Sequence, residues 1–300
     1  MIEKLHYNTI IVIESLDNSL DKTGAKLYEL IQKFEIKYTG IKTYYKSPNT
    51  KDAFIKILAF INDSVQNQNC LPIIHLEIHG NTNGVQCANK EFITWEELYP
   101  YFIAINIKLK NTLIITSSIC SSAYFYFKVD FKKPAPFFTL ISSISEIHNE
   151  IILESYEGFY NELLYSENIN NALNHLNLNF LRPTDNGIIS EVFIQDLLNE
   201  YKKLISRLPG LINFSIIDSK KIISETDKNH FYTNAINVHN ELFINTLKEI
   251  WFTYLMLDLY PETKNRYKSI KDICLENINK IDINKELKAD LIKEVSIQLG

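Results

Sequence analysis

Residues 71–80 of this 300-residue chain read LPIIHLEIHG, an apolar run that ends in His79 and Gly80. Short runs rich in Ile, Val and Leu are typical of strands that are buried on both faces of a parallel sheet. Four further runs of this kind are at residues 8–14, 41–45, 112–116 and 136–144. The sequence therefore predicts five buried strands, and residues 71–78 form the third.

Helical patterns lie between these strands. Residues 23–34 carry apolar side chains at the i, i+3, i+4, i+7 spacing of an amphipathic helix. Thr94 is a good N-cap, and Glu97 completes a capping box for a helix that leads to Asn111. Other helices are expected at residues 51–65, 149–164 and 169–176, with a small hairpin at residues 85–93. Alternating strands and helices predict an α/β fold, a mostly parallel sheet flanked by helices.

The last third of the chain has a different pattern. Helices are predicted at residues 190–207, 234–260, 266–280 and 283–299, and only residues 214–217 indicate a strand. We place a domain boundary near residue 188. The prediction is an α/β domain at residues 1–188 and a mainly helical region at residues 189–300 that packs on it.

Composition argues against several classes of function. The net charge of −5 and the short basic clusters, Lys132-Lys133 and Lys220-Lys221, make nucleic acid an unexpected direct partner. The N-terminus lacks the pattern of a signal peptide, and apolar stretches are interrupted by charge before the ~20 residues that a membrane span needs. We therefore expect a cytoplasmic protein with no membrane segment.

The four cysteines, at positions 70, 87, 120 and 274, show no CxxC spacing and no neighbouring His at zinc-finger intervals. This pattern predicts free thiols, without a disulfide framework or a structural metal. Acyl transfer by such a thiol would require no metal or organic cofactor. Three of the cysteines are expected to be structural, and Cys120 is the exception.

Cys120 and His79 are the candidates for chemistry. In an open parallel sheet, reactive groups gather at the carboxyl ends of the strands, where His79 ends the third strand and Cys120 follows the fourth. A free cysteine has a pKa near about 8.5, so a neighbouring imidazole is needed to raise its thiolate fraction. Gly80 lets the backbone approach a substrate carbonyl, and its N–H and that of Cys120 are candidates for an oxyanion hole.

These segments resemble a known family. The apolar strand that ends in His79-Gly80, and LIITSSICSS around Cys120, are similar to the two catalytic strands of caspase-like cysteine proteases, most closely those of CHAT domains. The hairpin, the helix that begins WEEL, and later segments such as FTLISSI and EGFYNEL extend the resemblance over roughly residues 8–180.

The resemblance implies a cysteine endopeptidase with a His79–Cys120 dyad that cleaves a partner protein. Since bacterial CHAT proteases often act as switched effectors, it also implies a role in antiviral (antiphage) defence and a regulatory protein partner for the helical region. A catalytically inactive caspase-like scaffold is the alternative. A small ligand at the switch point of the sheet ranks last, because no GxGxxG or Walker-type loop is present.

The chain departs from the family pattern around its cysteine. The Gln-Ala-Cys signature of animal caspases is absent, Ile119 replaces a small residue, and Ser122 stands where CHAT domains commonly have Gly. Metacaspases have an Asp two residues before the nucleophile that favours basic P1 side chains. This chain has Ser118 there, which does not support specificity for Arg or Lys.

Neighbouring residues also have simpler interpretations. His75 lies on the same side of the strand as His79 and is expected to be a satisfied buried histidine. Glu77 and Glu146 have positions from which they would orient His79 or line a pocket, but ion pairing or solvation is the more common role of such carboxylates. The aromatic run at residues 124–127 is expected to pack in the core.

Overall fold

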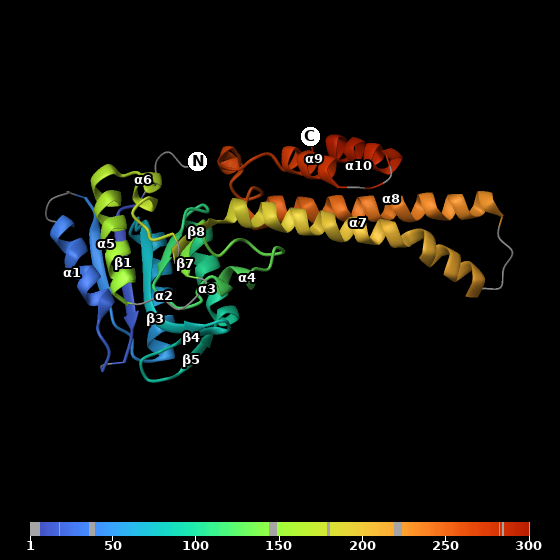
Figure 1. The fold of residues 1–300 in the computed structure, drawn as a ribbon. Coiled ribbons are helices and arrows are strands. Elements are labelled where there is room, and N and C mark those ends of the chain that lie inside the picture. Colours follow the sequence, from blue (N-terminus) through green and yellow to red (C-terminus); the bar gives the residue numbers. More distant parts are fainter. Residues whose placement is uncertain are drawn as a thin grey trace. The chain divides into compact units, whose positions relative to one another are not determined.

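The computed structural model describes residues 7–17, 19–35, 40–143, 149–178, 181–218, 224–281, 283 and 285–299. The chain forms two compact units, Met1–Asn186 and Gly187–Gly300. The first is an α/β unit and the second is helical, which confirms the predicted fold class (Figure 1).

One sheet organises the N-terminal unit. Its main strands follow the order β2-β1-β3-β6-β7-β8, and all neighbours in it are parallel except β7 and β8. Two short strands, β4 and β5, form an antiparallel hairpin on the end of β3. The strands are β1 (Thr9–Ser15), β2 (Lys42–Lys46), β3 (Pro72–Asn81), β4 (Gly84–Gln86), β5 (Phe92–Thr94), β6 (Ile114–Ser117), β7 (Thr139–Ser143) and β8 (Leu181–Asp185).

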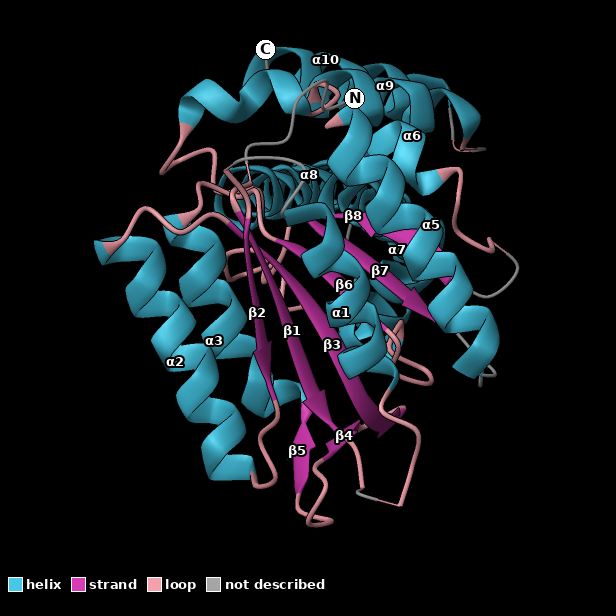
Figure 2. Ribbon diagram, turned by 90° about the vertical axis from the view of Figure 1, so that its left-hand side faces the viewer, coloured by secondary structure: helices cyan, strands magenta, loops and turns pink. Residues whose placement is uncertain are grey.

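Helices cover both faces of this sheet (Figure 2). The helices are α1 (Thr23–Glu35), α2 (Lys51–Asn67), α3 (Trp95–Lys108), α4 (Tyr124–Phe127), α5 (Asn149–Ser166) and α6 (Ile169–Leu173). Helices α1 and α5 cover the face that carries Ile10, Ile73 and Ile114, and this core continues into Tyr156 and Phe159 of α5. Helices α2 and α3 pack against each other on the opposite face.

The strand and helix order of the N-terminal unit was largely predictable. The five apolar runs are strands, and the predicted hairpin is formed by β4 and β5. The capping box at α3 is also confirmed, because Glu97 N donates to Thr94 Oγ1 while Thr94 N donates to the Glu97 carboxylate. Strand β8 was not predicted. It contains Pro183, a residue that is tolerated at the edge of a sheet but counts against a strand in sequence patterns.

The C-terminal unit is built from helices only, within the residues that the structure describes. They are α7 (Asn186–Asp218), α8 (Glu225–Glu249), a π-helical turn (Ile250–Tyr254), a 3-10 helix (Pro261–Arg266), α9 (Ile270–Lys280) and α10 (Lys285–Gln298). The predicted strand at residues 214–217 is wrong, because these residues continue α7. A short apolar run cannot be distinguished from a buried helical segment by periodicity alone.

Helices α7 and α8 run side by side in this unit (Figure 1). The ring of Tyr201 on α7 lies 5.0 Å from that of Phe243 on α8, and its hydroxyl donates to Asn240. Buried side chains of the other helices, among them Cys274 and Leu291, complete a separate core. In the part of the chain that the structure covers, no helix is both long and apolar enough to cross a bilayer.

Candidate active site

The third and fourth predicted strands are neighbours in the sheet. Strand β6 pairs in parallel with β3, so the carboxyl ends of both strands lie at the same end of the sheet. The chain after β6 stays attached to β3 for one more residue, because Ser118 N donates to Leu76 O at 2.9 Å. These two strands therefore position His79, Gly80 and Cys120 at the carboxyl end of the sheet, which is where the sequence pattern predicts them.

Gly80 packs directly against the segment that carries Cys120. A Cβ atom built on Gly80 would lie 2.2 Å from Ile119 Cγ2 and 3.5 Å from the carbonyl oxygen of Cys120. Ile119 is buried, so its side chain has little room to move away. Only glycine fits beside the Cys120 segment at this position, for a steric reason rather than a conformational one.

Cys120 lies in a short turn, residues 118–123, that we name the Cys120 loop. Ser122 N donates to Ile119 O at 3.2 Å, and Ser121 adopts a left-handed conformation with φ of 58°. Such a conformation is uncommon for residues other than glycine and tends to occur where the surrounding structure imposes it. Here hydrogen bonds to strands on both sides hold the turn.

The bonds to β7 come from Ser122 and Ala123. Ser122 is buried, its hydroxyl oxygen accepts a hydrogen bond from Ser143 N at 3.0 Å, and Ala123 N donates to Ser143 O at 2.9 Å. Ser122, which departs from the family pattern, thus has a structural role. Neither the Cys120 N–H nor the Ser121 N–H donates to any described group of the protein.

His79 occupies the exposed continuation of β3. It pairs with Gln86 of β4, and its side chain is exposed, whereas every residue from Pro72 to Ile78 is buried. Strand alternation places it on the same face as His75 and Glu77. Cys120 itself is half-buried, and all four cysteines are free thiols. An exposed histidine at the end of β3 and a half-buried cysteine in the loop that follows β6 thus lie at the same end of the sheet.

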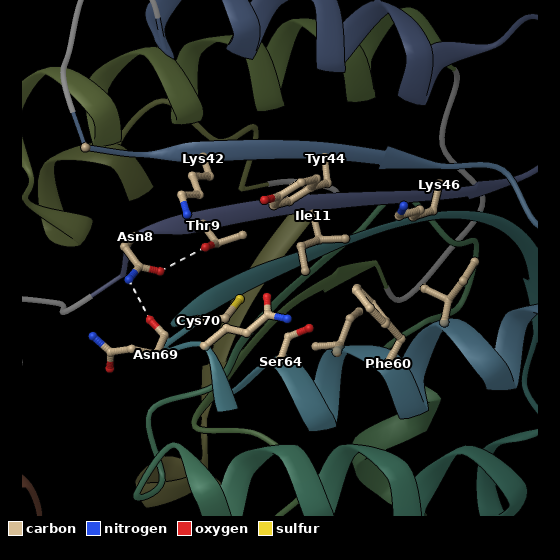
Figure 3. A pocket seen from close by; sticks show the side chains of 14 residues that line it. Asn8, Thr9, Ile11, Lys42, Tyr44, Lys46, Phe60, Ser64, Asn69 and Cys70 are labelled. Carbon is tan, nitrogen blue, oxygen red and sulfur yellow. Dashed lines mark hydrogen bonds between the residues drawn. The ribbon is translucent and has the colours of Figure 1, made fainter. Parts of the chain in front are cut away.

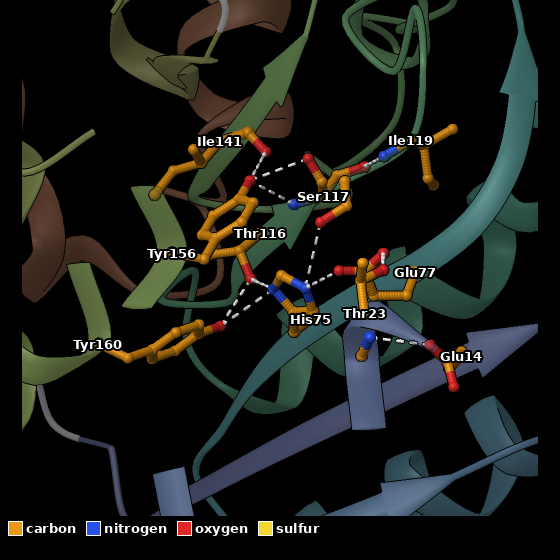
Figure 4. Close-up of polar contacts among 12 residues, drawn as sticks. Glu14, Thr23, His75, Glu77, Thr116, Ser117, Ile119, Ile141, Tyr156 and Tyr160 are labelled. Atoms are coloured by element: carbon orange, nitrogen blue, oxygen red, sulfur yellow. Dashed lines mark hydrogen bonds and ion pairs between the residues drawn. The ribbon is translucent and has the colours of Figure 1, made fainter. Parts of the chain in front are cut away.

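A buried polar cluster lies near the carboxyl ends of β3 and β6, on the face of the sheet that α1 and α5 cover (Figure 4). At its centre is His75, which is 0% exposed. His75 Nδ1 lies 2.7 Å from Thr116 Oγ1, and Thr116 Oγ1 lies 2.7 Å from the Tyr160 hydroxyl. His75 Nε2 lies 3.2 Å from the Glu77 carboxylate and 3.3 Å from Ser118 Oγ. The expectation that His75 is a satisfied buried histidine is confirmed.

The N-terminus of α1 completes this buried polar cluster. Thr23 Oγ1 donates to Glu77 at 3.0 Å, and Gly24 N donates to Glu14 at 2.8 Å. Glu14 and Glu77 are directly opposite each other in β1 and β3, and the Tyr45 hydroxyl also donates to Glu14. The positive end of the α1 dipole and these donors offset the cost of placing two carboxylates side by side. Glu77 is thus a buried hydrogen-bond partner of His75 Nε2.

Two tyrosines of α5 close the cluster. The Tyr156 hydroxyl donates to Ser117 O at 2.9 Å and accepts from Ser117 N at 3.0 Å. Burial raises the pKa of both Tyr156 and Tyr160, so each phenol keeps its proton. The sequence analysis identified only His75 and Glu77 of this cluster. The available signal was polar residues at alternate positions of an otherwise apolar strand.

The other residues that the sequence singled out are partly buried and partly exposed. In α4, Phe125 is buried against Trp95 and Phe137, whereas Tyr124 and Phe127 are exposed, so only part of the aromatic run belongs to the core. Glu146 lies outside the described residues. Cys87 and Cys274 are buried, and burial raises the pKa of both thiols. Within the described part of the chain, no cluster of three or more His, Cys, Asp or Glu side chains is arranged to hold a metal ion.

A cavity of about 170 Å³ lies elsewhere in the N-terminal unit (Figure 3). It is bounded by Lys42 and Tyr44 of β2 and by Phe60 of α2, and its polar end is formed by Asn8 and Asn69. The Asn8 side-chain amide donates to Asn69 O at 2.8 Å at the start of β1. Its lining residues include none of His79, Gly80 and Cys120, so this cavity is separate from the candidate site.

No protein-family model and no curated protein sequence matches this chain.

Proposed function

We propose that this protein is a cysteine endopeptidase that uses Cys120 as nucleophile and His79 as general base. The Cys120 thiol transfers its proton to His79 and its sulfur attacks a peptide carbonyl carbon, which forms a tetrahedral oxyanion. The N–H groups of Cys120 and Gly80 donate to that oxygen. His79 then protonates the leaving amine, and water, deprotonated by His79, hydrolyses the thioester. This chemistry requires no cofactor.

One observation carries the proposal: the tight packing of Gly80, which follows His79, against the segment that carries Cys120. A Cβ on Gly80 would be 2.2 Å from Ile119 Cγ2 and 3.5 Å from Cys120 O, so the space between Gly80 and this segment cannot hold one more carbon atom without a shift. The Cys120 N–H has no protein acceptor among the described residues. A thiol, an imidazole and backbone N–H groups at one end of the sheet are the elements that acyl transfer needs.

Thiol reactivity tests the dyad directly. We would measure the rate of iodoacetamide alkylation at Cys120 between pH 5 and 8 by mass spectrometry, in the wild type and in His79→Ala. Cys70, which is also half-buried, serves as the internal reference. We expect Cys120 to react faster than Cys70 below pH 8, and His79→Ala to remove the difference. Equal rates in both proteins would support the inactive scaffold instead.

The proposal assigns a regulatory protein partner to the helical unit. Three apolar side chains of α8, Phe231, Val238 and Leu242, are about 60% exposed. Their spacings of seven and four residues place them on one face of the helix. A photo-crosslinker at position 238 should capture the partner when it is co-expressed, whereas one at the exposed Asn229, on the opposite face, should not. Val238→Glu with Leu242→Glu should abolish capture without changing Cys120 alkylation.

A further inference from the structure

The two ring nitrogens of His75 face two different parts of the molecule. Nδ1 faces Thr116 in β6, which also contacts the Tyr160 hydroxyl. Nε2 faces Glu77 of its own strand and Ser118, the first residue of the Cys120 loop. The imidazole therefore lies between Thr116 of β6 and Ser118, at the start of the turn that carries Cys120.

The neighbours of His75 determine the direction of its hydrogen bonds. Nδ1 lies 2.7 Å from Thr116 Oγ1 and 3.4 Å from the Tyr160 hydroxyl, and either hydroxyl can donate to it. Nε2 then carries the proton and donates it toward the Glu77 carboxylate and Ser118 Oγ. Every polar group in this hydrogen-bond network has a partner. A buried network that is fully satisfied in this way makes its surroundings rigid.

Packing prevents the imidazole from changing its orientation. The ring is 0% exposed and lies edge-on to Tyr156 and Tyr160, with centroid distances of 4.7 and 5.8 Å. Tyr156 also bonds both backbone groups of Ser117, the residue that precedes the loop. The Nε2 atom thus has a defined position at the start of the Cys120 loop.

We propose that His75 is a positioning residue for the Cys120 loop. It acts through Ser118 and holds the first turn of the loop against β3, so that the Cys120 main chain stays beside Gly80. His75 does not contact substrate, and its Nε2 contact to Ser118 is the part that matters for the loop. As far as it concerns catalysis, this inference rests on the proposed function.

Two substitutions separate the two sides of the ring. The side-chain amide that His75→Asn introduces reaches the position of Nδ1 and retains the contact to Thr116. The longer side chain in His75→Gln places an N–H near Nε2 and retains the contact to Ser118. A purely structural role in the core would make the two variants similarly defective. A positioning role predicts that Gln, but not Asn, preserves the loop.

The first measurement is amide hydrogen exchange of residues 118–123 in the full chain, followed by mass spectrometry. It reports on the loop whether or not the protein is an enzyme, because the amides of Ser118, Ser122 and Ala123 are hydrogen-bonded. We expect exchange in His75→Asn to be about fivefold faster than in wild type, the ratio that corresponds to loss of one hydrogen bond. His75→Gln should stay within about twofold of wild type by the same reasoning.

Ser118→Ala tests the same contact from the half-buried side and keeps the test valid if substitutions of His75 do not fold. Ser118→Ala alone should speed loop exchange to the same extent as His75→Asn. The two substitutions together should add little, since they remove one shared contact. Equal exchange in wild type, His75→Asn and Ser118→Ala would overturn the inference, as would fully additive effects.

Alkylation of Cys120 then separates the two proposals. If the dyad is active, His75→Asn should lower the alkylation rate of Cys120 and leave that of Cys70 unchanged, with rescue in His75→Gln. If wild-type Cys120 lacks His79-dependent reactivity, the proposed function fails, while the exchange measurement still decides the role of His75. Loop exchange that changes without any loss of dyad reactivity would refute the catalytic part of the inference.

Discussion

Gly80→Ala introduces one methyl group at the contact between β3 and the Cys120 loop. Its Cβ would be 2.2 Å from Ile119 Cγ2, whereas ordinary contacts of this kind begin at 3.4 Å, so the loop or Ile119 must move by more than an ångström. Overpacking of this kind costs about 1–3 kcal/mol in unfolding free energy. Since Ile119 precedes Cys120, we also expect the alkylation rate of Cys120 to change.

Urea unfolding at neutral pH measures the stability cost, and two matched variants define its origin. Gly158→Ala adds a methyl group within α5, where the nearest atom is the Cβ of the exposed His175 at 3.2 Å. This variant should be neutral or more stable, because Ala favours a helix over Gly by about 1 kcal/mol. Ile119→Ala removes the atom with which the new methyl group collides.

The cost of Gly80→Ala should therefore shrink when it is measured in the Ile119→Ala background, although Ile119→Ala itself costs about 2–5 kcal/mol. A Gly80→Ala variant as stable as wild type, with unchanged Cys120 reactivity, would refute the steric argument. An unchanged cost in the Ile119→Ala background would show that the collision lies elsewhere, for example with Gly84 O, which is 3.1 Å from the same Cβ.

Three further predictions concern the caps, thiols and titrating groups. Thr94→Ala removes the capping box of α3 and should lower the unfolding free energy by about 1 kcal/mol. Thr94→Ser keeps a capping hydroxyl and should retain most of that stability. An equal loss of stability in Thr94→Ser would contradict the capping role. Cys87 and Cys274 should react with a thiol reagent only when the protein unfolds, because burial raises the pKa of both thiols, that of Cys274 to about 12. Labelling of either cysteine in the native protein at the rate of Cys70 would contradict this. Burial raises the pKa of Tyr201 from 10.0 to about 12, so above pH 10 the phenol ionises in the unfolded chain before it does in the folded one. The helical unit should therefore lose stability as the pH rises from 10 to 12, and Tyr201→Phe should reduce that slope in thermal unfolding; an equal slope would contradict the argument.

The fold of the N-terminal unit was predictable because the central strands of its sheet are buried on both faces. Such strands read as short apolar runs, and amphipathic helices between them show a 3.6-residue period. Strand β8 lacks this signal, since LRPTD is polar and Pro183 argues against a strand; pairing with β7 made it one. Residues 214–217 show the converse error, because an apolar tetrapeptide has no period of its own and the longer α7 decides its state.

The position of the candidate site was also predictable, since parallel strands bring their carboxyl ends to one edge. The adjacency of β3 and β6 follows from the tendency of successive strands to be neighbours. The contacts within the site were not predictable in this way. That Gly80 is packed against Ile119, and that Ser122 bonds to β7, depends on atoms from strands that are distant in the sequence.

The sequence by itself therefore determined the order of strands and helices, the cap of α3, and the placement of His79, Gly80 and Cys120 at strand ends. These features depend on local periodicity and local hydrogen bonds, which are encoded within a few residues. The tertiary structure alone decided what His75 contacts. Its partners Thr116, Ser118 and Tyr160 come from segments more than 40 residues away, and only folding brings them around one imidazole.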